Sequence, residues 1–297
     1  MYHNGKGGGR SMPITFQKLT HEYNAGTPFS YLALDHIDLN LQEGKITAII
    51  GETGSGKSTL VQHLNALLLP TEGSLKILDR EISASEKPKH LKSLRKHVGL
   101  VFQFPEYQLF EETIAKDIAF GPKNFGASEE EALQRAKDVI TLVGLDESYL
   151  ERSPFELSGG QKRRVAIAGI LAMDPDILVL DEPAAGLDPQ GAKEMMELFV
   201  RLHTEFHKTI FIVTHDMEHV LRYCDEVVVM DHGHVKTTCS VSSFFQDPSI
   251  LKEMGIHPPA VVSLRESLRE VGFEIDASIL TMEQLAQAVA KEVGHHE

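Results

Sequence analysis

The most informative segment of the chain reads Gly51-Glu52-Thr53-Gly54-Ser55-Gly56-Lys57-Ser58-Thr59. It matches the pattern of a glycine, four residues and then Gly-Lys-Ser/Thr, which is typical of a phosphate-binding loop. The glycines allow a tight turn in which several backbone N–H groups point at one anion. We expect Lys57 to reach the β- and γ-phosphates of a nucleotide and Ser58 to ligate Mg²⁺. A glycine-rich turn that merely happens to precede a lysine is the simpler explanation, and the strand-like and helix-like flanks argue against it.

The segments around this loop alternate between strand-like and helix-like patterns. Residues 14–41 show the alternating polarity of short antiparallel strands. Apolar runs typical of buried strands occur at residues 46–50, 98–102, 177–180, 209–213 and 227–230. Helical patterns lie between them, for example at 57–69 and 111–152, whereas residues 71–103 are expected to be rich in strands. This alternation predicts an α/β fold with a mainly parallel sheet covered on both faces.

Two acidic residues follow one of the predicted buried strands. Asp181 and Glu182 come directly after residues 177–180. In open α/β sheets, ligands bind beyond the carboxyl ends of the strands. We therefore expect Asp181 to hold Mg²⁺ beside the phosphate-binding loop and Glu182 to act as the general base that polarises the attacking water. An acidic loop that only caps the next helix is the alternative, and the phosphate-binding loop upstream argues against it.

A second glycine-containing helix start lies at Leu157-Ser158-Gly159-Gly160-Gln161. Ser158 is a suitable N-cap, and the glycines would let a phosphate approach the positive end of the helix. This signature segment follows the phosphate-binding loop and Gln103, and precedes the acidic pair, Asp188 and His215. In that order the motifs resemble the ABC ATPase family over residues 14–240. The resemblance implies an α/β P-loop NTPase of ABC type, with a mainly parallel core sheet, an N-terminal antiparallel β subdomain, an α-helical subdomain and a small C-terminal helical appendage.

The resemblance also implies a role for each matching residue. Gln103 would touch Mg²⁺ and the attacking water, Asp188 would line the boundary between two ATPase subunits, and His215 would contact the γ-phosphate. Tyr23 resembles the aromatic residue that stacks on adenine, with Phe29 and Tyr31 of the same predicted loop as alternatives. All nine residues of the phosphate-binding loop would contact the ATP bound to this chain. The ATP bound to the opposite subunit would be contacted by Ser158, Gly159, Gly160 and Gln161.

We expect the chain to divide into three parts. Residues 1–11 have the composition of a disordered or vector-derived leader, with Met12 as a natural start. Residues 12–240 would form the ATPase domain, with the helical subdomain at about 104–170. Residues 241–297 would form the helical appendage, which we expect to strengthen pairing of two ATPases through an apolar stripe at helical spacing, formed by Val261, Val262, Leu264, Leu268 and Val271. A stripe that packs only on its own domain is the alternative.

Several shorter segments narrow the resemblance to the ATP-binding A subunits of energy-coupling factor (ECF) transporters, in particular the second of the two A subunits. They are residues 25–29, 62–65, 102–110, 120–124 and 255–259. Such a subunit would work at the cytoplasmic face of the cell membrane with a second ATPase, a membrane coupling subunit and a substrate-binding membrane subunit, importing vitamins or transition-metal ions. We expect residues 103–125 to dock the coupling subunit, and the alternative is that Phe104, Leu109 and Phe110 are core residues of the adjoining helical region. Glu52 stands where the subfamily pattern has His, and Ala184 stands where Thr is commoner.

Composition limits the remaining choices. The chain has 297 residues, enough for one large α/β domain with an appendage, and its formal net charge of −14 disfavours a nucleic-acid partner. No apolar run approaches a membrane span, so another chain is expected to hold the protein at a membrane. Cys224 and Cys239 fit no metal or redox spacing, which favours a reducing cytosol. The alternatives are another ABC transporter ATPase, a non-transport ABC ATPase and a GTP switch, whose Asn-Lys-x-Asp motif does not occur.

Overall fold

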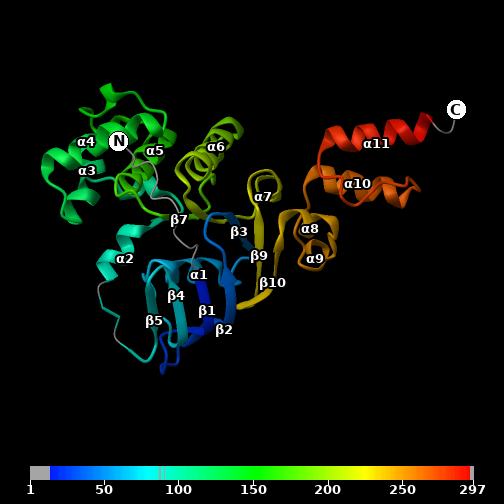
Figure 1. The fold of residues 1–297 in the computed structure, drawn as a ribbon, viewed down its shortest axis with the longest axis horizontal. Coiled ribbons are helices and arrows are strands. Elements are labelled where there is room, and N and C mark those ends of the chain that lie inside the picture. Colours follow the sequence, from blue (N-terminus) through cyan, green and yellow to red (C-terminus); the bar gives the residue numbers. More distant parts are fainter. Residues whose placement is uncertain (1–13, 87, 90, 295–297) are drawn as a thin grey trace.

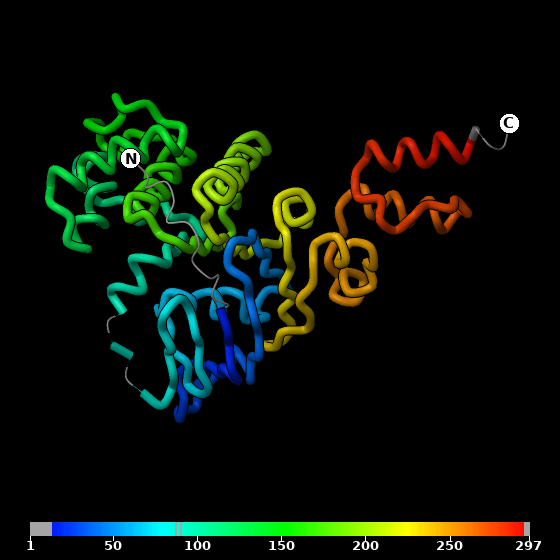
Figure 2. Tube along the Cα trace, viewed as in Figure 1, coloured from blue at the N-terminus to red at the C-terminus, as the bar shows by residue number. Residues whose placement is uncertain are grey.

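The computed structural model describes residues 14–86, 88–89 and 91–294, so the predicted leader at residues 1–11 lies outside the described part. Two sheets occupy the centre, one group of helices lies at one end, and the C-terminal helices extend from the other end (Figure 1). The chain passes from the N-terminal strands through the helical group, returns to the central sheet and then leaves toward the C-terminus (Figure 2).

The larger sheet has six strands in the order β10-β9-β3-β8-β7-β6. Every neighbouring pair is parallel except the antiparallel pair formed by β10 and β9. The predicted mainly parallel sheet is thereby confirmed. Its members are β3 (Ile46–Gly51), β6 (Val98–Val101), β7 (Ile177–Asp181), β8 (Thr209–Val213), β9 (Glu226–Asp231) and β10 (His234–Ser240).

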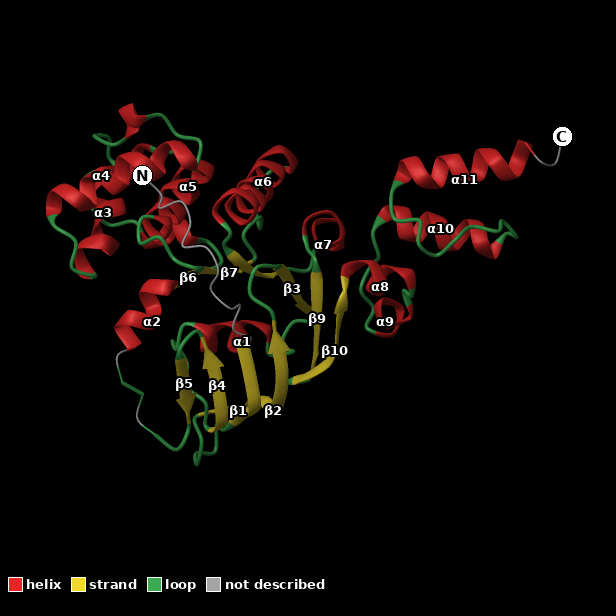
Figure 3. Ribbon diagram, viewed as in Figure 1, coloured by secondary structure: helices red, strands yellow, loops and turns green. Residues whose placement is uncertain are grey.

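The smaller sheet has four strands in the order β2-β1-β4-β5, and all of its pairs are antiparallel. Its members are β1 (Ile14–Tyr23), β2 (Tyr31–Leu41), β4 (Glu72–Ile77) and β5 (Arg80–Ser83). Helix α1 (Lys57–Leu64) packs between the two sheets, because its buried residues share one core with the inner faces of both (Figure 3). The helix that follows the phosphate-binding loop is therefore held from two sides.

Alternate residues of the larger sheet serve different cores. In β7, Ile177 and Val179 face α1 and the smaller sheet, whereas Leu178 and Leu180 face the helices on the opposite side. This period of two explains why the strand reads as a continuous apolar run. The helices on that opposite side are α3 (Ile114–Asn124), α4 (Glu129–Leu142), α5 (Gly159–Leu171) and α6 (Pro189–Phe206), with short 3-10 turns η1 (Pro105–Gln108), η2 (Glu147–Tyr149) and η3 (Pro154–Glu156).

The C-terminal helices share a third core with β3 and β9. This core contains Ala48, Ile50, Val227 and Val229 from the sheet, together with Phe244, Phe245 and Leu251. The helices concerned are α7 (Met217–Tyr223), α8 (Val241–Gln246), α9 (Ser249–Glu253), α10 (Ala260–Glu270) and α11 (Met282–Gly294). The segment from residue 241 onward is thus helical and also covers one face of the larger sheet.

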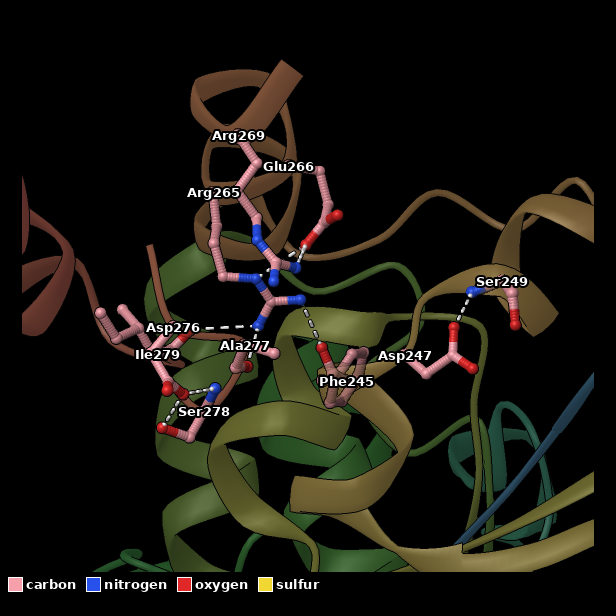
Figure 4. A network of polar contacts seen from close by, with 10 residues as sticks. All are labelled: Phe245, Asp247, Ser249, Arg265, Glu266, Arg269, Asp276, Ala277, Ser278 and Ile279. Carbon is pink, nitrogen blue, oxygen red and sulfur yellow. Dashed lines mark hydrogen bonds and ion pairs between the residues drawn. The ribbon is translucent and has the colours of Figure 1, made fainter. Parts of the chain in front are cut away.

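A single arginine joins the parts of this appendage. Arg265 on α10 is fully buried, and its guanidinium donates to Phe245 O at 2.7 Å, Ala277 O at 2.5 Å and Ile279 O at 3.2 Å. Its Nε donates to Glu266 Oε1 at 2.9 Å. Figure 4 shows these contacts reaching from α10 to α8 and to the segment that leads into α11. These four hydrogen bonds give the guanidinium oxygen acceptors, which burial of a charged group requires.

One local prediction was wrong, and one was incomplete. Helix α1 ends at Leu64, not at residue 69, because Asn65 Oδ1 accepts a hydrogen bond from Leu67 N at 3.0 Å and Ala66 has a φ of 53°, which no α-helix contains. The expectation that residues 71–103 are rich in strands is confirmed by β4, β5 and β6, but the same span also holds helix α2 (Leu91–His97), of which only Leu94 is buried and which the sequence did not predict. One buried residue leaves no periodic pattern to recognise.

Candidate nucleotide-binding and catalytic site

The predicted site residues gather at one edge of the larger sheet. Strands β3, β6, β7 and β8 run parallel, so their carboxyl ends meet at the same edge. Gly51 ends β3, Asp181 ends β7, and Gln103 and His215 lie two residues beyond the ends of β6 and β8. This edge brings together the phosphate-binding loop, the acidic pair, Gln103 and His215.

Two glycines of the loop are required by their close contacts. A Cβ at Gly51 would lie 2.2 Å from Met230 O, and a Cβ at Gly56 would lie 2.7 Å from Ala33 O. Both residues have a positive φ, 150° and 99°. A side chain is therefore excluded by space and disfavoured by backbone conformation at both positions. Met230 belongs to β9 and Ala33 to β2, so the loop touches both sheets.

Lys57 folds back over the loop. Its Nζ donates to Gly51 O and to Glu52 O, both at 2.7 Å. Burial lowers the pKa of Lys57, while the carboxylates of Glu182, Asp181 and Glu52 oppose that shift. The ammonium group is thus held among loop carbonyls and acids at the place where phosphates are expected, and incoming phosphate oxygens can replace the carbonyl oxygens as its acceptors.

Asp181 lies beside the first helical turn after the loop. Its carboxylate accepts a hydrogen bond from the Ser58 side chain, and burial raises its pKa despite that bond and the nearby Lys57. A hydroxyl and a carboxylate are hard oxygen ligands of the kind that Mg²⁺ takes with water and phosphate oxygens. No cluster of three or more His, Cys, Asp or Glu suited to a metal occurs in the described part of the chain. The hydroxyl and the carboxylate fit Mg²⁺, which usually takes only one or two protein carboxylates.

Glu182 and His215 are in direct contact. Glu182 Oε1 lies 2.8 Å from His215 Nδ1, although the two residues follow different strands. The Glu182 side chain is 17% exposed and the His215 side chain 79% exposed. Glu182 has a φ of 50°, a left-handed conformation that costs energy for a residue with a side chain. The strained backbone aims its carboxylate across the edge of the sheet toward His215.

Gln103 precedes a second strained residue. Phe104 has a φ of 58° and forms the N-cap of η1 (Pro105–Gln108). Gln103 itself is exposed. The turn changes the direction of the chain directly after Gln103, so its position depends on how η1 is held.

Tyr23 lies against the helix that follows the phosphate-binding loop. Its hydroxyl is 3.2 Å from Thr59 Oγ1, and its ring meets His21 edge-on with centroids 4.5 Å apart. Tyr31 pairs with Tyr23 across β1 and β2, and its hydroxyl donates to Gly54 O at 3.4 Å. Phe29 is 81% exposed and has no such contact described. Tyr23 and Tyr31 both flank the loop, and the choice of Tyr23 as the adenine-stacking residue stays a prediction.

The signature segment lies away from this edge. Ser158 and Gln161 form a reciprocal capping box at the start of α5, with Gln161 N donating to Ser158 Oγ at 3.4 Å and Ser158 N donating to Gln161 Oε1 at 3.0 Å. Helix α5 sits within the helical group, apart from α1 and the loop that precedes it (Figure 1). Ser158, Gly159, Gly160 and Gln161 are therefore not brought to the phosphate-binding loop of their own chain.

Asp188 is an N-cap in this structure. Its Oδ1 accepts a hydrogen bond from Gly191 N at 2.7 Å at the start of α6. The loop between Glu182 and this cap contains Ala184 and Gly186, which line the same surface depression as Glu182 and His215. The cap fixes where this loop ends, a role that the sequence prediction did not include.

Arg163 and Glu106 are residues that the sequence prediction missed. Lys162, Arg163 and Arg164 read together as a basic helix start, yet the Arg163 side chain is only 3% exposed. Its guanidinium meets Glu106 of η1 and the loop that follows Glu182. Three basic residues in a row give no sign that the middle one is buried. A long basic side chain can turn inward from a helix face that otherwise carries solvent-exposed charges.

The chain is similar to known proteins of one family. The family model described as "ABC transporter" matches residues 34–185. A curated relative from Enterococcus faecalis, the energy-coupling factor transporter ATP-binding protein EcfA2, is 53% identical over 282 residues, which cover 95% of this chain and 98% of the relative. The protein of the same name from Geobacillus kaustophilus is 52% identical and covers 94% of this chain and 96% of the relative.

Solved structures give the same result. CbiO1 of Clostridium perfringens, described as part of the ABC transporter complex cbiONQ, has a TM-score of 0.71 and 37% identity, covering 85% of this chain and 98% of that one. The ATP-binding cassette MJ0796, solved as a dimer in a post-hydrolysis state bound to ADP and phosphate, has a TM-score of 0.68 and 30% identity, covering 77% of this chain and 98% of that one. Among the described helices of the present chain, none combines the length and the apolar character needed to span a bilayer.

Proposed function

The chain belongs to the ABC transporter family, among the ATP-binding subunits of energy-coupling factor transporters, and from that premise we propose how its residues bind and hydrolyse ATP to drive uptake of a vitamin or another micronutrient. The family and the α/β ABC-type fold predicted from the motifs are confirmed. The protein is an ATPase of an ECF-type importer. The division of labour among its residues is the proposal.

The phosphate-binding loop holds the triphosphate in this proposal. Residues 51–59 present their N–H groups and the start of α1, and Lys57 exchanges its two carbonyl acceptors for phosphate oxygens. Tyr23 stacks on adenine from the end of β1. Helix α1 is clamped between two sheets, so the loop is placed before the nucleotide arrives. Preorganised donors lose little free energy to rearrangement when an anion binds.

Ser58, Asp181 and Gln103 would hold Mg²⁺ in this proposal. The hydrogen bond between Ser58 and Asp181 places a hydroxyl and a carboxylate together at the start of α1. When bound, the ion neutralises charge that develops on the phosphates.

The contact between Glu182 Oε1 and His215 Nδ1 is the observation that carries the catalytic assignment. It joins the ends of two parallel strands next to the phosphate-binding loop, where a γ-phosphate and its attacking water would lie. Glu182 accepts the proton of that water, and His215 holds the Glu182 carboxylate in place and contacts the γ-phosphate. The water oxygen then bonds to phosphorus as the bond to ADP breaks, which releases phosphate.

The ATP site is completed by a second ATPase subunit in this proposal. The signature residues Ser158–Gln161 lie apart from the loop of their own chain, and their helix end is free to meet phosphate from another subunit. Asp188 lies on the same boundary. Two nucleotides bound between two such subunits close the pair, and hydrolysis removes the bridging charge and reopens it. The partner is a second ECF-type ATPase, in a heterodimer.

The membrane partners would bind through residues 103–125, at the cytoplasmic face of the membrane. Tyr107 is 86% exposed, Phe110 56% and Phe120 44%, and the rings of Phe110 and Phe120 meet edge-on with centroids 4.9 Å apart. An exposed aromatic cluster directly after Gln103 suits a helix of a membrane coupling subunit. A separate membrane subunit would then bind the imported substrate.

Copurification of partner proteins and the ATP binding and turnover of two variants test this function. Tagged chain recovered from detergent-solubilised membranes should bring with it a second ATPase and two membrane proteins, and the complex should hydrolyse ATP. Glu182→Gln should retain ATP binding and lose turnover by about 10²–10⁴-fold. Lys57→Ala should weaken binding and turnover together, since the phosphate contact is lost. A complex in which Glu182→Gln hydrolyses ATP at the wild-type rate would rule out the assignment of the base.

A further inference from the structure

A buried arginine at the start of the signature helix connects three segments that carry separate parts of the site. The Arg163 side chain is 3% exposed and lies on α5, five residues after Ser158. Its guanidinium carbon lies 5.7 Å from the ring centroid of Phe104. A charged group this deeply buried needs several hydrogen-bond partners, and the structure provides them from two directions.

The first direction is the turn that follows Gln103. Arg163 Nε donates to Glu106 Oε2 at 3.1 Å and Nη2 donates to Glu106 Oε1 at 3.0 Å. This two-pronged arrangement fixes both the distance and the relative angle of the two groups. Glu106 lies in η1, three residues after Gln103, and its side chain is 16% exposed. The ion pair therefore holds η1 against the signature helix.

The second direction is the loop that follows Glu182. Arg163 Nη1 donates to Pro183 O at 3.3 Å and to Ala185 O at 2.6 Å. Pro183 is the residue next to Glu182, and Ala185 N donates back to Glu182 O at 3.1 Å. One guanidinium therefore bonds to the turn beyond Gln103 and to the turn beyond the proposed base.

Backbone strain lies at both ends of this connection. Phe104 and Glu182 have φ values of 58° and 50°, which are unfavourable for residues with side chains. Such conformations persist only where surrounding contacts enforce them. The partners of Arg163 lie two residues after Phe104 and one residue after Glu182, at the positions from which such contacts act.

We propose that Arg163 is a positioning residue for ATP hydrolysis, which sets Gln103 and Glu182 relative to each other and to the signature segment through Glu106 and the 183–185 loop. A buried ion pair adds little net stability compared with apolar residues of similar volume, so its consequence here is geometric. Movement of the helical subdomain that carries α5 shifts both turns together. The inference rests on the proposed catalytic role of Glu182.

The test uses the complex recovered with the tagged full-length chain, and measures kcat and KM for ATP together with the melting temperature. Arg163→Gln should lower kcat by about 10–100-fold, because small displacements of positioned groups are costly, and should leave KM within about twofold, because the phosphate-binding loop keeps its contacts. Glu106→Gln should lower kcat less, since the carbonyl contacts of Arg163 survive. The double variant should lose no more than Arg163→Gln alone.

Arg164→Gln is the matched control. Arg164 is the next residue on α5, and it bonds Val143 O at 2.8 Å and Glu194 Oε2 at 2.7 Å, away from both turns. The Arg164→Gln variant should have a lower melting temperature, while its kcat stays within about twofold of the wild-type value. A structural role alone would make Arg163→Gln behave like Arg164→Gln. If Arg163→Gln does not fold, Glu106→Gln decides the question.

Two outcomes overturn the proposal. Wild-type kcat in a folded Arg163→Gln, or in Glu106→Gln when Arg163→Gln does not fold, rejects the positioning role and leaves the proposed function intact. A wild-type complex without ATP turnover rejects the function and the positioning role together.

Discussion

The imidazole of His63 meets that of His21 edge-on, with ring centroids 4.9 Å apart, directly behind the helical turn that contains Thr59. His63 Nδ1 lies 2.8 Å from Thr59 O, and among the described residues its Nε2 has no hydrogen-bond partner. Burial lowers the pKa of His63 from 6.5 to about 4, and the neighbouring His21 adds to the shift. The ring is therefore neutral in the folded protein at physiological pH.

This pKa predicts a loss of stability in acid. Between pH 6.5 and about 4, His63 is protonated in the unfolded chain but stays neutral in the folded chain. The free energy of unfolding therefore falls as pH decreases through that window. Once the pH has fallen through the whole window, this loss in the free energy of unfolding is about 3 kcal/mol. Urea unfolding at several pH values should show a shallower dependence for His63→Gln than for the wild type. Parallel curves for the two proteins would contradict the prediction.

His215→Ala should lower kcat by about 10²-fold or more, because Glu182 loses the side chain that holds its carboxylate. KM for ATP should change little, since the phosphate-binding loop is untouched. His232→Ala serves as a control, because His232 is 87% exposed and pairs with Asp231 instead. Steady-state ATP hydrolysis by the membrane complex provides both constants, and equal activity of the two variants would exclude the role of His215.

Arg265→Leu should lower the free energy of unfolding by about 3 kcal/mol, because the carbonyls of Phe245, Ala277 and Ile279 lose their donor within the fold. Arg269→Leu is the comparison, since that side chain is 39% exposed and its ion pair with Glu266 contributes at most about 1 kcal/mol. Urea denaturation of the two variants measures the difference. A loss of the same size in both would show that burial of Arg265 is not the cause.

Tyr107→Ala should reduce capture of the membrane coupling subunit without changing the melting temperature, because the ring is 86% exposed. Leu109→Ala should instead lower stability, by about 2 kcal/mol, because Leu109 packs against the core beneath the helical subdomain. Capture assays and thermal unfolding on both variants separate docking from folding. Undiminished capture by Tyr107→Ala would refute the docking role of residues 103–125.

The residues of the predicted C-terminal stripe differ in burial, so the test of pairing uses the exposed ones. Val261 and Val262 are buried on their own domain, whereas Leu264 is 45% and Val271 74% exposed. The variant Leu264→Ser/Val271→Ser should weaken nucleotide-free association on a sizing column and keep its melting temperature. Leu67→Ser, 46% exposed elsewhere, should change neither. Unchanged elution of the double variant would leave the stripe without a role in pairing.

Truncation of the chain after Ser240 would be a poor test of pairing. Phe244, Phe245 and Leu251 cover Val227 and Val229 of the central sheet. Their removal would expose apolar surface and destabilise the ATPase domain itself. Loss of pairing in the truncated chain would then have two explanations.

The parts that sequence predicts well are those with strict local rules. Gly51 and Gly56 of the phosphate-binding loop follow from contacts that admit no side chain, and the apolar runs of β3, β7, β8 and β9 follow from burial on both faces. The parts that it misses depend on partners distant in the chain. Arg163 meets Glu106 across 57 positions, and nothing near either residue indicates the other. Similarly, α2 has a single buried residue and hence no period to detect.

Gly51 and Gly56 are placed where the phosphate-binding loop touches β9 and β2, and this affects how mutant alleles are interpreted. A side chain at either position collides with a backbone oxygen of the scaffold, so an inactive allele would combine a defect in assembly of the two sheets with a defect in nucleotide binding. Lys57 Nζ instead bonds the carbonyl oxygens of Gly51 and Glu52 within the loop itself, so its replacement leaves the contacts of the loop with β9 and β2 in place and isolates the chemical defect. In a genetic screen, alleles at the two glycines would reduce protein abundance, whereas alleles at Lys57 would leave abundant but inactive subunits that compete for the same partners.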